Sequence, residues 1–135
     1  MDLTLSTCFV VVDDPDAAVG FYRDALGLEV RQDVPQDQLR WITVGSPAQP
    51  GVGIVLTNYL NTGPADRDTV RALVDQGALA GVHFQAADLD AAFAQARGAG
   101  AEVVQEPAEQ PWGARDFAVR DPAGNMVRVA QAPGA

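Results

Sequence analysis

The residues Asp14-Pro15-Asp16-Ala17-Ala18 return later in the chain as Asp88-Leu89-Asp90-Ala91-Ala92, at an offset of 74 positions. The similarity continues from Arg23 to Val30 in the first copy and from Arg97 to Val103 in the second, where the offset falls to 73. A fixed offset is typical of an internal duplication, in which each copy forms the same supersecondary unit. We therefore expect both halves of the chain to have the same fold.

The first copy begins with an apolar segment followed by a helix signal. Residues 3–12 form an apolar and β-branched run, which indicates a strand. Asp14 is suited to cap a helix, and Pro15 fits the first helical turn, where an N–H group is not needed. The helix carries apolar side chains at helical spacing and ends at Gly27. Strands are expected next over residues 28–34, 38–45 and 52–58, with Pro35 and residues 46–51 in the loops between them.

The second copy repeats this order. A strand is expected over residues 79–86, a helix from Asp88 to about Arg97, and strands over residues 102–106, 114–120 and 125–131. Residues 121–125 predict a tight hairpin, because proline fixes φ and glycine tolerates positive φ. Helical spacing between Asp66 and Asp75 predicts a short helix between the copies. The chain is therefore interpreted as one duplicated α+β domain, with module 1 over 3–58, a linker over 59–78 and module 2 over 79–131.

Composition argues against several classes of function. The chain has 135 residues, the size of a single domain, and no apolar run approaches the ~18 residues needed to cross a bilayer. Its formal net charge of −9 disfavours nucleic acid and anionic membranes, which bind clustered positive charge. The N-terminus lacks a signal-peptide pattern, so we expect a cytoplasmic protein. The one cysteine, Cys8, is interpreted as a small buried hydrophobe rather than a reactive thiol.

Two longer stretches carry a family resemblance: residues 11–28, which include Phe21-Tyr22-Arg23-Asp24-Ala25-Leu26-Gly27-Leu28, and residues 111–125, from Pro111-Trp112-Gly113 to Arg120-Asp121-Pro122-Ala123-Gly124-Asn125. Over nearly the whole chain they resemble the vicinal oxygen chelate superfamily of glyoxalases, bleomycin-resistance proteins and extradiol dioxygenases. The resemblance implies two tandem βαβββ modules whose mixed sheets curl into a half-barrel around a ligand-sized cavity. It leaves the function open, because the superfamily includes isomerases, lyases, dioxygenases, thiol transferases and metal-free drug-binding proteins.

The metal positions are where this chain departs from the superfamily pattern. The resemblance places one ligand on the first and one on the last strand of each module, and these positions hold Thr7, Val55, Gly81 and Arg128. A catalytic divalent ion needs about three converging nitrogen, oxygen or sulfur ligands. Glycine and valine offer none, threonine binds weakly, and a protonated arginine repels the ion. We therefore expect no metal and no other cofactor, and the metal-dependent chemistry of the family is not carried over.

Further candidate residues are those that strand alternation sends to the same face as these positions. Trp41 and Trp112 are either packing residues or flat rings at the cavity mouth that stack on planar or cationic ligands. The expected ligand-binding residues are Thr7, Phe9, Trp41, Val55, His83, Trp112, Met126 and Arg128.

Two of these residues have more than one interpretation. His83, the one histidine, is a polar lining residue, a structural residue or an acid–base group. Arg128 at an inner position needs an anionic or carbonyl partner, which is either an internal carboxylate or an acidic group of the ligand. The net negative charge of the protein favours a cationic ligand, so the two charge arguments oppose each other.

The sequence favours a metal-independent small-molecule binding protein, such as an antibiotic-sequestering or self-resistance protein with an aromatic or planar ligand. Sequestration needs only a complementary surface, which a cavity without catalytic ligands can supply. The alternative is a glyoxalase-like lyase or isomerase, or a dioxygenase-type enzyme, that uses His83 without a metal or has metal ligands outside the four positions. An accessory domain that acts through protein contacts is a third interpretation. The resemblance also implies a homodimer.

Overall fold

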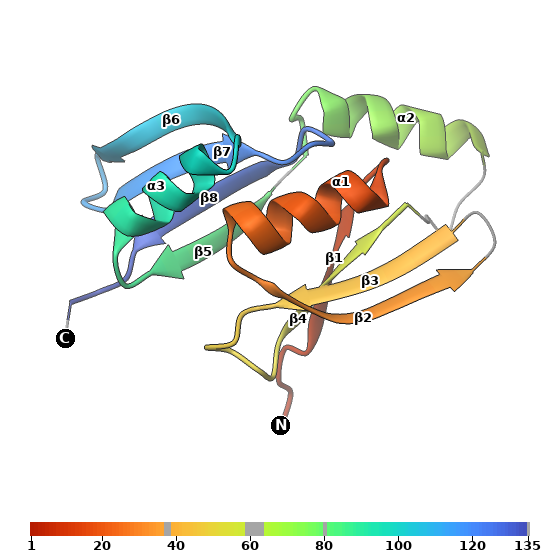
Figure 1. The fold of residues 1–135 in the computed structure, drawn as a ribbon, viewed down its shortest axis with the longest axis horizontal. Helices are drawn as coiled ribbons and strands as arrows, with labels where there is room; N and C mark the ends of the chain where they lie inside the picture. The colour runs from red at the N-terminus through yellow and green to blue at the C-terminus, as the bar shows by residue number, and fades with distance from the viewer. Residues whose placement is uncertain (37–38, 59–63, 80, 135) are drawn as a thin grey trace.

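Two four-stranded sheets form the framework of the protein. The computed structural model describes residues 1–36, 39–58, 64–79 and 81–134. Within these ranges the strand orders are β1-β4-β3-β2 and β5-β8-β7-β6, so the two modules have the same topology. Figure 1 shows the sheets next to each other, with α1 between them and α3 across the second. The predicted α+β fold of two βαβββ modules is confirmed, and the sheets are curled without closing into a barrel.

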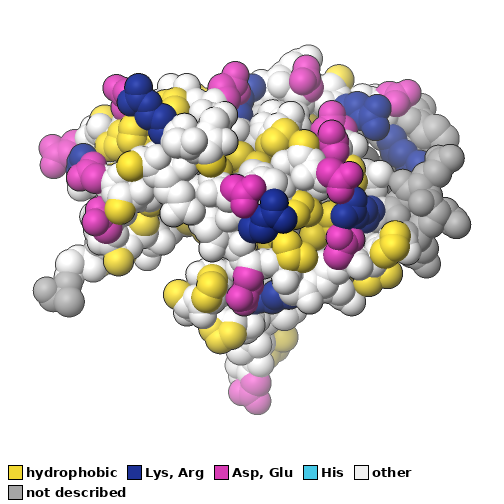
Figure 2. All heavy atoms as spheres, in the orientation of Figure 1, with side chains coloured by type: hydrophobic (Ala, Val, Ile, Leu, Met, Phe, Trp, Pro, Cys, Tyr) yellow, Lys and Arg dark blue, Asp and Glu magenta, His cyan; other side chains and the backbone are white. Residues whose placement is uncertain are grey.

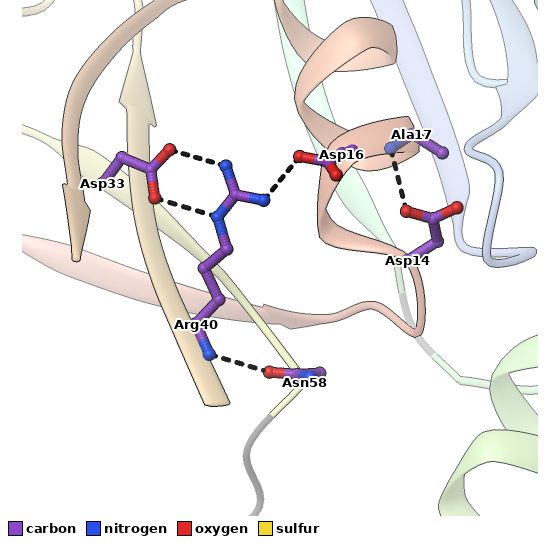
Figure 3. Close-up of polar contacts among 6 residues, drawn as sticks. All are labelled: Asp14, Asp16, Ala17, Asp33, Arg40 and Asn58. Carbon is purple, nitrogen blue, oxygen red and sulfur yellow. Dashed lines mark hydrogen bonds and ion pairs between the residues drawn. The ribbon is translucent and has the colours of Figure 1, made fainter. Parts of the chain in front are cut away.

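Module 1 consists of β1 (Thr7–Val11), α1 (Pro15–Gly20), the π-helix η1 (Phe21–Ala25), β2 (Glu29–Gln36), β3 (Leu39–Gly45) and β4 (Gly53–Thr57). β1 and β4 are parallel, and the other pairs are antiparallel. Asp14 caps α1, because its Oδ1 accepts a hydrogen bond of 3.2 Å from the backbone N–H of Ala17 (Figure 3). At Gly27 the backbone has a φ of 71°, which suits glycine and turns the chain from the helix into β2.

Module 2 consists of β5 (Val82–Ala86), α3 (Leu89–Gly98), β6 (Glu102–Glu109), β7 (Arg115–Arg120) and β8 (Met126–Gln131). Asp88 caps α3 as Asp14 caps α1, with its Oδ1 accepting a 3.1 Å hydrogen bond from Ala91. β5 and β8 are parallel, which repeats the pairing of β1 with β4. Between the modules, α2 (Pro64–Asp75) forms where the sequence predicted a short helix.

The structure differs from the sequence prediction at two prolines. Pro35 was expected in a loop but lies in β2, opposite Arg40 of β3. β6 continues through Pro107 to Glu109, beyond its predicted end at residue 106, and its register with β7 shifts between Gln105 and Ala108. Both β2 and β6 are edge strands, and a proline on an edge need not break the sheet because one side has no partner strand. The two strands are therefore longer than the positions of proline suggested.

Other boundaries are shorter than expected or fall outside the described residues. The first strand was expected over residues 3–12 but covers only Thr7–Val11, and the fifth begins at Val82 rather than at residue 79. Residues 37–38, 59–63 and 80, which include parts of the predicted third strand, linker and fifth strand, lie outside the described residues.

The hydrophobic core joins the two modules. It includes the buried side chains of Val10, Val12, Tyr22, Ile42, Leu56, Leu89, Phe117, Val119 and Val127. Polar contacts reinforce this junction: Tyr22 donates a 2.8 Å hydrogen bond from its hydroxyl to Oδ2 of Asp121, and Asn125 donates to the carbonyl oxygen of Val11 at 2.8 Å. The modules are thus held together by apolar packing and by buried hydrogen bonds that cross between them.

Most of the arginine side chains pair with a carboxylate. On the face drawn in Figure 2, arginine side chains lie beside aspartate and glutamate rather than gathering into a basic patch. Arg40 is an example, because its guanidinium group contacts both Asp33 and Asp16 (Figure 3). In the described parts of the chain, no helix has the length and apolar character needed to traverse a bilayer.

Candidate ligand-binding site

The face of each sheet that points away from the core carries the candidate site residues. On β1, Cys8 and Val10 pack toward the core, whereas Thr7 and Phe9 are exposed. On β8, Val127 and Val129 belong to the core, so the alternating residues Met126 and Arg128 lie on the other face. His83 has the same relation to its neighbours on β5, and the register places it beside Arg128.

The outer face of the first sheet is apolar and aromatic. The rings of Phe9 and Trp41 pack edge to face, with centroids 5.4 Å apart and an angle of 79° between the planes. Val55 lies between Phe9 and Thr43 in the strand register and is buried. Phe9 nevertheless remains 59% exposed, and Trp41 is partly exposed. Trp41 therefore packs against a neighbouring ring and still offers aromatic surface to a ligand.

The second sheet carries a polar network on its outer face. Nη1 of Arg128 lies 3.1 Å from Oδ1 of Asp116 and donates a 3.0 Å hydrogen bond to Oε1 of Gln105. The same Asp116 oxygen accepts hydrogen bonds from the side-chain amides of Gln105, at 3.2 Å, and Gln110, at 2.8 Å. Arg128 therefore has an internal carboxylate partner, Asp116, which is one of the two partners expected from the sequence.

Asp116 is the buried centre of this network, with 2% of its surface exposed. Burial alone would raise its pKa, because a carboxylate loses solvation. Hydrogen bonds from Gln110, Gln105 and Arg128, together with the charge of Arg128, outweigh burial and hold the pKa of Asp116 below its ordinary value. Asp116 is therefore ionised at neutral pH and fixes the position of the Arg128 guanidinium group.

The sequence prediction did not include Asp116, Gln105 or Gln110. A partial signal for Asp116 was present in the sequence, because it is the one carboxylate in the predicted strand over residues 114–120. The structure places it on the face of Arg128, since Ala118 pairs with Arg128 and Asp116 lies two residues from Ala118. An arginine at an inner position requires a carboxylate, and the neighbouring strand supplies one at the diagonal position. The two glutamines had no comparable signal, because a shift in register within β6 and a loop place them.

One hollow borders this network, and a second hollow shares His83 with it. The Arg128 hollow, of about 280 Å³, is lined by His83, Phe84, Trp112, Ala114, Asp116, Arg128 and Ala130. The β1–β5 groove, of about 350 Å³, is lined by Cys8, Phe9, Val10, Val11, Leu79, Gly81, Val82, His83 and Asn125. Trp112 is 70% exposed at the edge of the first hollow. Together the hollows have the size of a small-molecule site and combine aromatic walls with a few polar groups.

A wider cleft of about 580 Å³ separates the modules on the side of the helices. Its lining includes Leu26 and Leu28 from module 1 and Phe84 and Gln95 from module 2, and it also reaches His83. The described residues that line it include no aspartate, glutamate, lysine or arginine. This cleft offers shape and amide groups, whereas the charged chemistry lies on the outer face of the second sheet.

The four metal positions do not fit a divalent cation. A Cβ atom at Gly81 would lie 1.7 Å from the carbonyl oxygen of Met126, so the backbone admits no larger side chain there without a shift. Val55 is a buried hydrocarbon, and Arg128 carries a positive charge. Thr7 would be a single weak ligand. Among the described residues, no group of three or more histidine, cysteine, aspartate or glutamate side chains is arranged to hold a metal ion.

Comparison with known proteins identifies the superfamily to which this fold belongs. The model of the Glyoxalase/Bleomycin resistance protein/Dioxygenase superfamily matches residues 4–129. The chain belongs to this superfamily. The resemblance identified from the sequence motifs is therefore confirmed.

Three similar proteins illustrate the range within the superfamily fold. The uncharacterized protein YurT of Bacillus subtilis (strain 168) is 31% identical over 124 residues, which are 90% of this chain and 94% of YurT. The crystal structure of UcmS2 has a TM-score of 0.86 and 31% identity, over 96% of this chain and 98% of UcmS2. The crystal structure of TnmS3, an antibiotic binding protein from Streptomyces sp. CB03234, has a TM-score of 0.76 and 26% identity, over 98% of each chain.

Proposed function

We propose that this protein is a metal-independent small-molecule binding protein that holds an aromatic or planar ligand in the Arg128 hollow and the adjoining β1–β5 groove. The observation that carries the proposal is the composition of this face. Aromatic side chains and a few polar groups surround the hollows, while Gly81, Val55 and Arg128 occupy places where a catalytic metal needs ligands. Such a surface supplies contact and orientation without a Lewis acid.

The comparisons support this proposal. TnmS3 is described as an antibiotic binding protein, and its fold covers 98% of this chain at 26% identity. By analogy, the ligand of this protein is an antibiotic or a similar planar natural product, and its role is sequestration or self-resistance in the cytoplasm. Stoichiometric binding needs no turnover, so a site without catalytic ligands is sufficient for this role.

Of the eight residues expected from the sequence, Phe9, His83, Trp112 and Arg128 line the two hollows, with Asp116 as the anchor of Arg128. The proposal keeps the other four as flanking residues on the strands that border the hollows: Thr7, Trp41, Val55 and Met126. Phe9 and Trp112 supply aromatic contact in the two hollows, and Trp41 adds ring surface beside Phe9. His83 supplies polar contact to both hollows, and Arg128 supplies it to the Arg128 hollow. Val55 is buried and Met126 is partly buried, so we assign both a packing role.

The enzyme alternative has weaker support. A general base is usually oriented by a second group that hydrogen-bonds to its far nitrogen. Within the described residues, His83 is exposed and makes no hydrogen bond to another side chain or to the backbone. His83 is therefore better suited to contact a ligand than to hold a proton at a fixed position.

A homodimer is part of the same proposal. Leu3 and Leu5, in the segment before β1, are 84% and 67% exposed, and Phe9 of β1 is 59% exposed. Exposed apolar side chains that gather in one part of a surface mark contact surfaces. A second copy of the chain would cover them and would enclose the β1–β5 groove. Light scattering should give the mass of a dimer, and Leu5→Asp should shift it toward the monomer.

Binding is tested by tryptophan fluorescence with a panel of planar aromatic antibiotics. We expect saturable quenching by at least one compound, a smaller signal and weaker binding in Trp112→Phe, and no effect of a chelator on affinity. Metal analysis of the same preparation should find no stoichiometric transition metal. The proposal is wrong if stoichiometric zinc, iron, manganese or nickel is present and required for binding, or if no compound in a broad panel gives a response.

A further inference from the structure

We infer that the Arg128 hollow selects planar aromatic ligands that carry an ionised acidic oxygen, as a carboxylate or a phenolate, and that Arg128 is the residue that recognises it. This inference rests on the proposed function and names the ligand class of the same site. It follows from how Arg128 is anchored, from which charges line the hollow, and from the shape of its walls.

The internal partner of Arg128 leaves most of its donors free. A guanidinium group has five N–H donors in a rigid plane. Within the described residues, the hydrogen bonds and the ion pair of Arg128 involve Nη1 alone, toward Gln105 and Asp116. The contact with Asp116 therefore fixes the plane of the group and leaves Nε and Nη2 available. A fixed fork loses little rotational freedom when a ligand oxygen binds, which favours two parallel hydrogen bonds to a carboxylate.

The different exposure of Asp116 and Arg128 favours an anionic ligand. Among the described residues that line the hollow, Asp116 is the one carboxylate and Arg128 the one permanent cation. Asp116 is 2% exposed and already accepts from two amides and the guanidinium group, whereas 28% of the Arg128 side chain remains exposed. A ligand in the hollow therefore contacts the positive end of the pair, with the negative charge buried behind it.

The walls of the hollow favour a flat ligand. Trp112 and His83 contribute planar rings, and the small side chains of Ala114 and Ala130 leave space between the rings and Arg128. Within the described residues Trp112 has no ring partner, in contrast to the paired rings of Phe9 and Trp41. An aromatic ligand could stack on Trp112 while its acidic oxygen reaches the guanidinium group.

The net charge of −9 does not reverse this preference. Charges more than about 8 Å apart are largely screened at physiological ionic strength, so the overall charge acts mainly on the rate of encounter. A charge-assisted hydrogen bond at contact distance is roughly twice as strong as a neutral one. The local guanidinium group therefore determines which ligand stays bound.

The test uses three probes that share one ring system and differ in charge: 2-naphthoate, 2-naphthamide and 2-naphthylmethylamine. Isothermal titration calorimetry or ligand-observed NMR measures the affinity of each. We expect 2-naphthoate to bind at least about tenfold more tightly than the neutral amide, the difference expected of a charge-assisted hydrogen bond. The ammonium probe should bind most weakly. A further arm with 2-naphthol above and below its own pKa separates a phenolate from a carboxylate as the source of the anionic oxygen.

Variants assign the preference to Arg128. Arg128→Met should reduce the ratio of acid to amide affinity to about one, and Arg128→Lys should retain a preference for the acid because it keeps the charge. Arg115→Met is the matched control, since Arg115 also lies on the second sheet and pairs with an aspartate, Asp90, but does not line the hollow. If Arg128→Met does not fold, the double variant Asp116→Asn/Arg128→Met removes both charges and leaves no buried carboxylate without its partner.

The outcomes separate this inference from the proposed function. Equal binding of acid and amide, tighter binding of the ammonium probe, or a preference for the acid that persists in Arg128→Met would overturn the inference and leave small-molecule binding intact. If none of the probes binds and the fluorescence panel gives no response, the proposed function fails together with the inference. A preference for the acid that Arg128→Met abolishes and Arg115→Met preserves supports both.

Discussion

Replacing Tyr22 with phenylalanine should loosen the junction between the modules. Tyr22 is fully buried, and its hydroxyl donates a 2.8 Å hydrogen bond to Oδ2 of Asp121, 99 residues away in the sequence. Asp121 also accepts from the backbone N–H groups of Ala123, Gly124 and Asn125 through Oδ1 and from the side chain of Asn125 through Oδ2. The substitution therefore removes the donor that belongs to module 1 and leaves the local turn in module 2 intact.

The size of the effect follows from this geometry. A hydrogen bond to a charged group contributes about 1.5–3 kcal/mol, and the four remaining donors on Asp121 keep the loss near the lower part of that range, at about 2 kcal/mol. Unfolding entropy is about 2.1 cal/mol/K per residue, so a chain of 135 residues should lose about 7 °C in Tm. Only one oxygen atom is removed, so the cavity left behind adds little to this cost.

Urea denaturation and calorimetry measure the loss, and a pH titration provides an independent check. Burial, and then the charge and the hydrogen bond of Asp121, raise the pKa of Tyr22 well above its ordinary value. The folded state therefore favours the neutral phenol, and the stability it contributes is present below about pH 10, the unfolded pKa, and is lost as the pH rises through the higher folded pKa. Of the two tyrosines in the chain, Tyr22 should ionise only as the protein unfolds, and Tyr22→Phe should remove this late phase. A change in unfolding free energy below about 0.5 kcal/mol, within the range of ordinary surface substitutions, would show that the hydrogen bond does not join the modules.

Three further predictions concern other parts of the structure. Gly81→Ala should destabilise the protein by about 2–4 kcal/mol in urea denaturation, because its Cβ atom would lie 1.7 Å from the carbonyl oxygen of Met126, and a near-neutral result would contradict this contact. Asp116→Asn should flatten the loss of stability at acidic pH. The lowered pKa of Asp116 contributes stability above the unfolded pKa of about 3.9, and this stability disappears as the pH falls through the folded pKa. An unchanged dependence of unfolding free energy on pH would show that Asp116 does not make this contribution. Arg40→Ala should cost less than about 1 kcal/mol despite its contacts with Asp33 and Asp16, because all three groups are accessible to solvent, and a larger loss would indicate a packing role.

Much of the fold could be predicted from the sequence because the signals that determine it are local and repeated. The Asp14 and Asp88 caps form the hydrogen bonds expected of them, and Gly27 has the positive φ that ends the first helix. The expectation of a loop at Pro35 was wrong, because the cost of proline in a strand depends on whether a partner strand lies on that side. That information belongs to the assembled sheet and not to the segment.

The candidate site was predictable only in part, for a related reason. Alternation along β8 identified the face of Arg128, and it also identified the need for an anionic partner. The choice of Asp116 depended on the register between β7 and β8, and Gln110 reaches the network from the loop between β6 and β7. Strand periodicity predicts which face a residue occupies, whereas the positions of its neighbours depend on register and loop geometry.

At the four positions where the superfamily resemblance places metal ligands, packing as well as residue identity disfavours a metal ligand. Restoring a ligand at Gly81 would require the backbone of β8 to move away, because the carbonyl oxygen of Met126 occupies the space of a side chain. Replacing Arg128 with a carboxylate would place a second negative charge beside the buried Asp116 and would raise the pKa of one of the two groups. Each of these two substitutions would therefore lower the stability of the protein before any ion binds, and a metal site would need both. The Asp116–Arg128 pair, which holds a positive charge at one of these positions, also positions the guanidinium group at the edge of the hollow. For this reason we interpret the residues at the metal positions as parts of a binding surface and not as the remains of a catalytic one.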